Sequence, residues 1–105
     1  MEVSIYTTDF AKAELQKIFN YYKEVGTLAL AKKILKEILS EIARLQKFPA
    51  LGAKEELLDD QPEEFRYILC RHYKIIYWYN YSIKRIEIVD VFDTRQSPVQ
   101  INRFL

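Results

Sequence analysis

The chain has 105 residues and a mass of 12.6 kDa, which predicts one domain over residues 1–105 with a single core. Its composition, 50% apolar and 30% charged, is that of a folded globular protein and excludes intrinsic disorder. No apolar run approaches the roughly 18 residues of a membrane span, and a short strand pattern stands where a signal peptide would have its apolar core. We therefore expect a cytoplasmic protein with no membrane contact.

The net charge of +1 is unevenly distributed along the chain. Residues 1–50 carry a net charge of +2, residues 51–64 carry −5, and residues 65–105 carry +4. A nucleic-acid partner would therefore have to bind the last forty residues. The lone Cys70 excludes an internal disulfide and cannot supply a zinc site, so we predict that it is a small core residue.

The first half of the chain predicts a strand followed by two helices. Weak alternation indicates a strand at Glu2–Thr7, and Thr8 or Asp9 can cap the helix that follows. The buried face of this helix is predicted from apolar residues at helical spacing: Ala11, Leu15, Ile18 and Tyr22. Gly26 is expected to end the helix because glycine tolerates the left-handed conformation common at helix ends.

The second helix has the clearest periodicity in the sequence. Its predicted apolar stripe comprises Leu28, Ala31, Leu35, Ile38, Ile42 and Leu45. Its lysines and glutamates fall largely on the remaining surface, which we interpret as a solvated charged face. Phe48-Pro49 ends the helix, and the short connection around Gly26 predicts an antiparallel helical hairpin.

Residues 49–64 contain two prolines and six carboxylates without a sustained period. This pattern predicts a solvated connecting loop with one helical turn at Glu55 to Leu58. Clustered acids can bind a divalent cation, but nothing in the sequence fixes their mutual geometry. We therefore predict no metal site and no cofactor.

Three consecutive strands are predicted between Phe65 and Arg95, because Ile, Val, Tyr, Phe and Trp dominate this stretch. The strands are 65–71, 73–81 and 85–93, joined by tight reversals, and such short connections favour an antiparallel meander. Alternation places Ile86 and Ile88 on the face opposite Val89 and Val91. In the tail, three apolar residues could anchor against the core: Val99, Ile101 and Phe104.

The predicted fold class is α+β, with an N-terminal strand and an antiparallel two-helix hairpin packed on a mainly antiparallel four-stranded sheet. The helices are expected to cover one face of the sheet. Functional residues are therefore expected on the other face.

Several stretches of the sequence together resemble the RelE/ParE superfamily of bacterial toxins from type II toxin–antitoxin systems. They are the Pro49–Gly52 turn after the second helix, Arg66 at the start of the meander, the Tyr73–Tyr77 run, and the ending Val91-Phe92-x-x-Arg95-x-x-Pro98. The resemblance covers nearly the whole chain. None of these motifs is a catalytic signature, so the resemblance indicates a scaffold more than a mechanism.

The resemblance implies a growth-inhibiting toxin that a cognate antitoxin holds inactive with extended and helical segments. RelE-like members cleave mRNA in the ribosomal A site without a metal, whereas ParE-like members inhibit DNA gyrase. The Pro49–Gly52 turn and the Arg95-x-x-Pro98 ending are more similar to the ParE-like, plasmid-stabilisation branch. The alternatives are a RelE-like mRNA endonuclease and a decayed toxin that only binds its antitoxin.

The candidate site residues depend on which activity applies. If the chain is a nuclease, the resemblance assigns phosphate binding to Arg66 and Arg95, with added charge from Arg71 and Lys74 and a proton-transfer role for His72 or a tyrosine. If it binds a protein, the tail and the strand before it are candidate contact surfaces, and Arg66, Arg71 and Arg95 are candidate target contacts. Many nuclease relatives have a histidine where this chain has Asp93, and the tail lacks their Tyr or His. A carboxylate there repels a scissile phosphate.

Structural roles are alternatives for the same residues. In this alternative, Arg66 pairs with Glu63, Glu64 or Asp90, and Arg95 pairs with Asp93 or the acidic loop. His72 lies at a predicted reversal, where a polar residue is ordinary. The charged surface of the helical hairpin could serve a homodimer instead of a toxin–antitoxin hetero-oligomer.

Overall fold

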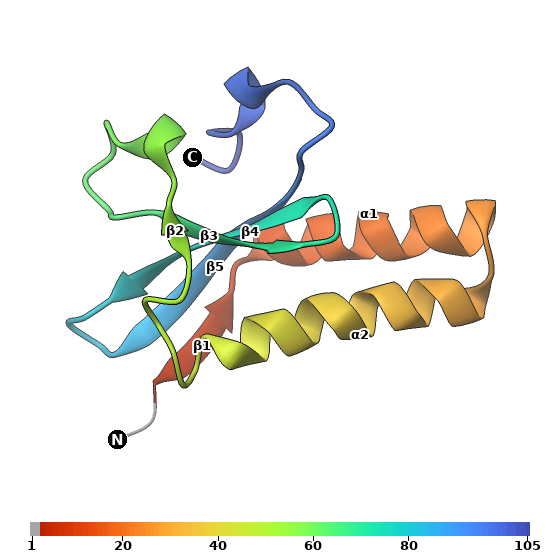
Figure 1. The fold of residues 1–105 in the computed structure, drawn as a ribbon, viewed down its shortest axis with the longest axis horizontal. Coiled ribbons are helices and arrows are strands. Elements are labelled where there is room, and N and C mark those ends of the chain that lie inside the picture. The colour runs from red at the N-terminus through yellow and green to blue at the C-terminus, as the bar shows by residue number, and fades with distance from the viewer. Residues whose placement is uncertain (1–2) are drawn as a thin grey trace.

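The computed structural model describes residues 3–105 as two helices packed on one sheet (Figure 1). The regular elements are β1 (Ser4–Thr7), α1 (Asp9–Val25), α2 (Leu28–Arg44), β2 (Ala53–Lys54), β3 (Arg66–Cys70), β4 (Tyr73–Asn80) and β5 (Arg85–Asp93), with short 3-10 turns η1 (Glu56–Leu58) and η2 (Pro98–Gln100). The predicted α+β class, helical hairpin and meander are confirmed. Glu2, part of the predicted first strand, lies outside the described residues.

The sheet has five strands in the order β1-β5-β4-β3-β2. The β3-β4-β5 meander is antiparallel, and β1 pairs parallel with β5. The prediction of four strands missed β2, a two-residue strand that pairs Ala53 with Tyr67 and Lys54 with Arg66. Two residues are too few to produce an alternating pattern, so β2 is a strand because it pairs with β3 and not because of its local propensity.

Helix α1 begins and buries its apolar face as predicted. Thr8 is the N-cap, and its side-chain oxygen accepts a hydrogen bond from the Ala11 N–H at 3.2 Å. Gly26 follows the helix, but its φ of −126° is not left-handed, so the predicted reason for this glycine was wrong. A Cβ there would lie 2.7 Å from Leu30 Cδ2 and 3.0 Å from the Tyr22 carbonyl oxygen. Close packing in the hairpin turn therefore requires glycine.

Helix α2 is rotated relative to the predicted stripe. Four of the six predicted residues are buried: Ala31, Ile38, Ile42 and Leu45. Ile34, which the prediction omitted, is fully enclosed, whereas Leu28 is exposed and Leu35 is only partly buried. The hairpin end of the helices extends past the sheet (Figure 1), and α2 begins at this end with the exposed Leu28.

The apolar side chains form two clusters, one on each face of the sheet, instead of the single core predicted. The larger cluster lies between the sheet and the helices and includes Cys70, which is buried as predicted. The smaller cluster lies on the other face, under the segments that contain η1 and η2. Ile101 and Phe104 join it as predicted, but Val99 points outward and is exposed.

A bulge in β5 explains one error in the predicted faces. The pairing of β4 with β5 shifts by one residue after Ile76, which is opposite Asp90, while Tyr77 is opposite Ile88. Val89 is the extra residue, so Val91 returns to the helix-facing side with Ile88. Strict alternation placed Val91 on the opposite face because it cannot register an inserted residue.

Candidate functional site

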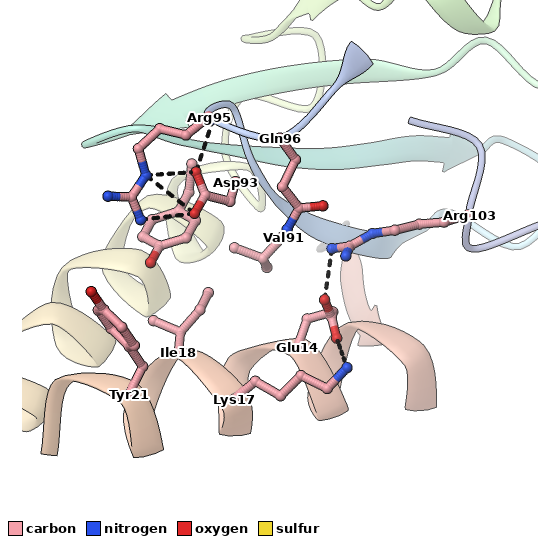
Figure 2. A pocket seen from close by; sticks show the side chains of 10 residues that line it. Glu14, Lys17, Ile18, Tyr21, Val91, Asp93, Arg95, Gln96 and Arg103 are labelled. Atoms are coloured by element: carbon pink, nitrogen blue, oxygen red, sulfur yellow. Dashed lines mark hydrogen bonds and ion pairs between the residues drawn. The ribbon is translucent and has the colours of Figure 1, made fainter. Parts of the chain in front are cut away.

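A pocket of about 230 Å³ lies where the end of β5 meets helix α1 and the C-terminal tail (Figure 2). The strands contribute Tyr73, Val91 and Asp93, the helix contributes Glu14, Lys17, Ile18 and Tyr21, and the segment after β5 contributes Arg95, Gln96 and Arg103. Arg95 is the one candidate residue from the sequence that lines this pocket. The pocket is on the helix side of the sheet, opposite to the face on which functional residues were expected.

Arg95 is held by its neighbour Asp93. The guanidinium donates from Nε and Nη2 to both carboxylate oxygens, the shortest contact being 2.9 Å (Figure 2). The Arg95 backbone N–H donates to the same carboxylate at 2.9 Å. These hydrogen bonds lower the pKa of Asp93, and Asp93 in turn raises the pKa of Arg95. The arginine side of the pair is exposed, whereas Asp93 is largely covered.

His72 lies beside this pair. Its Nε2 is buried, has no hydrogen-bond partner among residues 3–105, and is 3.8 Å from Asp93 Oδ1. Its ring lies against Tyr73, with the ring centres 4.2 Å apart. Burial, followed by a hydrogen bond with Tyr22, raises the pKa of the Tyr73 hydroxyl. Tyr73 therefore remains protonated at neutral pH and is a poor general base.

The predicted reversal at the end of β3 contains Arg71, which has a positive φ of 54°. Its guanidinium binds both carboxylate oxygens of Glu37 on α2 at 3.0 Å. This side chain therefore connects the β3-β4 turn to the helix. The bond also lowers the pKa of Glu37.

Lys74 and Arg66 lie away from the pocket. Lys74 is on the face of β4 opposite the helices, where its Nζ binds the buried Glu55 at 2.7 Å and lies 4.3 Å from the centre of the Tyr67 ring. Arg66 donates to the Gly52 carbonyl at 2.8 Å and to Glu64 at 3.0 Å. Of the three carboxylates proposed as structural partners for Arg66, the structure shows Glu64.

The five candidate residues do not converge. Arg66 pairs with Tyr77 across the sheet, whereas Asp93, beside Arg95, pairs with Tyr73. These positions are four residues apart along β4, or about 13 Å. Lys74 faces the other side of the sheet. His72 and Arg95 both lie beside Asp93, whereas Arg71, next to His72 in the turn, binds Glu37 on α2.

The sequence prediction did not include Asp90 and Arg103, a buried ion pair near the pocket. Arg103 binds both oxygens of Asp90 at 2.9 Å and Glu14 at 2.7 Å, and Glu14 also binds Lys17 at 3.0 Å. Asp90 is fully buried, and burial raises its pKa although Arg103 opposes the shift. An acid inside an apolar strand, at Asp90, was the available signal. The sequence did not reveal its partner, which lies 13 residues away in the tail.

Comparison with known proteins identifies the family. The sequence model for the ParE toxin of type II toxin–antitoxin system, parDE, matches residues 5–98. The chain belongs to the ParE toxin family. A chain of the chromosomal ParDE TA system from P. aeruginosa has the same fold, with a TM-score of 0.71 and 22% identity over 87% of this chain and 95% of that one. No curated protein matches the sequence.

Two further features bear on what this ParE-family toxin can bind. Within residues 3–105, no three His, Cys, Asp or Glu side chains gather closely enough to hold a metal ion. Over the same residues, neither α1 nor α2, nor any shorter helix, has the length and apolar character needed to cross a bilayer.

Proposed function

We propose that this ParE-family toxin inhibits growth by binding a protein target, DNA gyrase, and that a cognate antitoxin neutralises it. The observation that carries the proposal is the separation of the candidate cations. Arg66, Arg71, Lys74 and Arg95 each bind a different carboxylate, and they lie along both faces of the sheet. Cleavage of RNA through its 2′-hydroxyl requires cations gathered around one phosphate.

The pocket beside α1 also argues against RNA cleavage. Asp93 occupies the guanidinium that a phosphate would need, and its charge repels the phosphorane. Tyr73 keeps its proton and is therefore a poor general base. Protein binding requires none of these groups to be free.

A toxin–antitoxin partnership fits the family and the fold. The similar chain from P. aeruginosa is part of a ParDE TA system. We infer that the present chain forms a hetero-oligomer with its own antitoxin and acts in the cytoplasm, where gyrase is found. A homodimer through the charged surface of the helical hairpin is the alternative assembly.

The deciding experiment is DNA supercoiling by purified gyrase, titrated with refolded, antitoxin-free protein. Inhibition or trapped cleavage complexes that are relieved by the antitoxin would support the proposal. Unchanged supercoiling by well-folded protein would contradict the gyrase target. Cleavage of ribosome-bound mRNA would then indicate the RelE-like alternative, and unchanged growth on overexpression without the antitoxin would indicate a decayed toxin.

A further inference from the structure

The two 3-10 turns lie side by side on the sheet face opposite the helices (Figure 1). Between them is a hollow of about 220 Å³. Its rim consists of Leu57, Asp60 and Gln61 from the segment around η1, and Pro98, Val99 and Asn102 from the segment around η2. We call these six residues the twin-turn surface. The η2 half of this surface lies in the tail that the sequence offered as a target contact, and the η1 half was predicted only as a solvated loop.

A buried ion pair fixes each turn to the sheet. Glu55, immediately before η1, binds Lys74 of β4 at 2.7 Å, and its carboxylate is almost fully buried. Arg103, after η2, binds both oxygens of Asp90 on β5 at 2.9 Å. Beneath the turns, Leu58 and Ile101 are buried in the smaller apolar cluster. The surface is therefore held in one geometry before any partner arrives, which lowers the entropic cost of binding.

The turns present apolar side chains that the fold itself does not use. Leu57 is 53% exposed, although its neighbour Leu58 is buried. Val99 is 80% exposed, although Ile101, two residues further on, is buried. Val99 has the highest exposure among the large apolar residues described in the chain. Apolar anchors on a rigid base with a hollow between them are typical of protein–protein contact sites.

The segment around η1 is rich in acidic side chains, and one of them, Asp60, lines the hollow. Glu56, Asp59, Asp60 and Glu63 form no ion pair with any cation in residues 3–105. On the η2 side, Arg103 is committed to carboxylates, and Asn102 is neutral. The resulting field repels nucleic-acid phosphates and attracts basic protein surfaces.

We propose that the twin-turn surface docks a basic, apolar-centred surface on the toxin's protein target. The inference rests on the proposed function, because it names the side of the toxin that faces the target. Leu57 and Val99 supply the anchors, and the four acids steer the encounter.

The test compares two matched variants. Leu57→Ser/Val99→Ser removes the anchors, and Ile83→Ser, which alters an equally exposed apolar residue (53%) in the β4-β5 loop, is the control. We expect the double variant to need about tenfold more protein, or more, for the same gyrase inhibition, with the control unchanged. Both should melt near the wild-type temperature and still co-purify with the antitoxin.

A third variant, Asp59→Lys/Asp60→Lys, tests the charge of the surface. It should slow association with gyrase and weaken the salt dependence of that association rate.

Each outcome has a distinct meaning. Full inhibition by the folded double variant would overturn the docking surface and leave the gyrase target intact. Loss of antitoxin binding with inhibition retained would overturn it in favour of an antitoxin contact. If the wild type arrests growth without affecting gyrase, growth arrest replaces supercoiling as the readout. Loss of growth arrest in the double variant would then support the twin-turn surface as the docking site for a different target. A wild type that neither inhibits gyrase nor arrests growth overturns both proposals.

Discussion

Arg103 binds two carboxylates at once, and one of them, Asp90, is fully buried in the middle of β5. A charge in such a place is tolerated only when a partner neutralises it and its oxygens are hydrogen-bonded. Arg103 meets both requirements, and its guanidinium also lies between the rings of Phe10 and Phe92, 5.4 and 5.2 Å from their centres. This one side chain therefore connects the tail to both β5 and α1.

We predict that Arg103→Met lowers the free energy of unfolding by about 3–5 kcal/mol, because it leaves a buried carboxylate without a partner. Urea denaturation at neutral pH measures the change. Arg44→Met is the matched control, since it removes an exposed pair with Glu41 within α2, and we expect a change within about 0.5 kcal/mol. Equal effects of the two substitutions would show that the Asp90 pair does not stabilise the fold.

The deficit of Arg103→Met should depend on pH. Burial already raises the pKa of Asp90 in the folded protein, and loss of Arg103 raises it further. A group whose pKa is raised in the folded state stabilises the folded protein at pH values below its unfolded-state pKa. This stabilisation is lost as the pH rises through the folded-state pKa. The deficit should therefore be largest at neutral pH and shrink as Asp90 is protonated. A deficit that is constant with pH would point to lost packing of the arginine stem instead.

Arg95 is expected to behave differently from Arg103. Its ion pair with Asp93 is exposed, so Arg95→Ala should leave the free energy of unfolding nearly unchanged. If Arg95 contacts the target, the same substitution reduces toxicity. Growth arrest at matched expression, with the urea midpoint measured in parallel, checks both statements. Undiminished toxicity at normal expression would count against a target contact by Arg95.

At the scale of elements, the turn that follows α2 is organised by one tyrosine from β4. The buried Tyr77 hydroxyl accepts from the Gly52 N–H and donates to the Pro49 carbonyl, both at 2.8 Å. A Cβ on Gly52 would lie 2.6 Å from the Tyr67 carbonyl oxygen, so the backbone approach itself requires glycine. The Pro49–Gly52 motif therefore fixes the segment after α2 to the sheet.

Tyr77→Phe should destabilise the protein by about 1–3 kcal/mol, because two buried backbone groups lose their partner while the ring packing is kept. Tyr81→Phe removes an exposed hydroxyl and is the control, with an expected change near zero. Thermal unfolding of both variants provides the comparison. Similar melting temperatures for Tyr77→Phe and the wild type would show that water replaces the hydroxyl at no cost.

Local signals predicted the elements that have a period or a cap of their own. Thr8, the α1 stripe and the meander follow from spacing alone. The bulge at Val89 and the strand β2 could not be predicted, because each exists only through pairing with a neighbour. The site is subject to the same limit. Asp90 was visible as an acid within an apolar strand, but its partner Arg103 is 13 residues away, and Glu14, which Arg103 also binds, lies 76 residues from Asp90 in the sequence.

At the scale of the whole molecule, the sheet is covered on both faces, and the two covers are built differently. The helices cover one face with a long apolar stripe. The other face is covered by two irregular segments that contain few buried apolar residues and are each fixed by an ion pair. The first of these segments was predicted as a solvated loop, because its buried Leu58 lies in a stretch dominated by carboxylates. The tail was predicted to pack against the core through Ile101 and Phe104, as it does.

Removal of residues 98–105 tests whether the second cover is part of the folding unit. It deletes Ile101 and Phe104 from the smaller cluster and leaves Asp90 unpaired. A buried Ile contributes about 2–5 kcal/mol and the ion pair about 3–5 kcal/mol, and these neighbouring effects do not simply add.

Because domains of this kind are stable by only about 5–15 kcal/mol, the shortened chain should be largely unfolded or aggregated at 25 °C. Deletion of the exposed Leu105 alone is the control and should leave the urea midpoint unchanged. A shortened chain with the wild-type midpoint and slope would make the tail a peripheral appendage. The sheet would then tolerate an uncovered face, and the rigid base that the twin-turn surface requires would not exist.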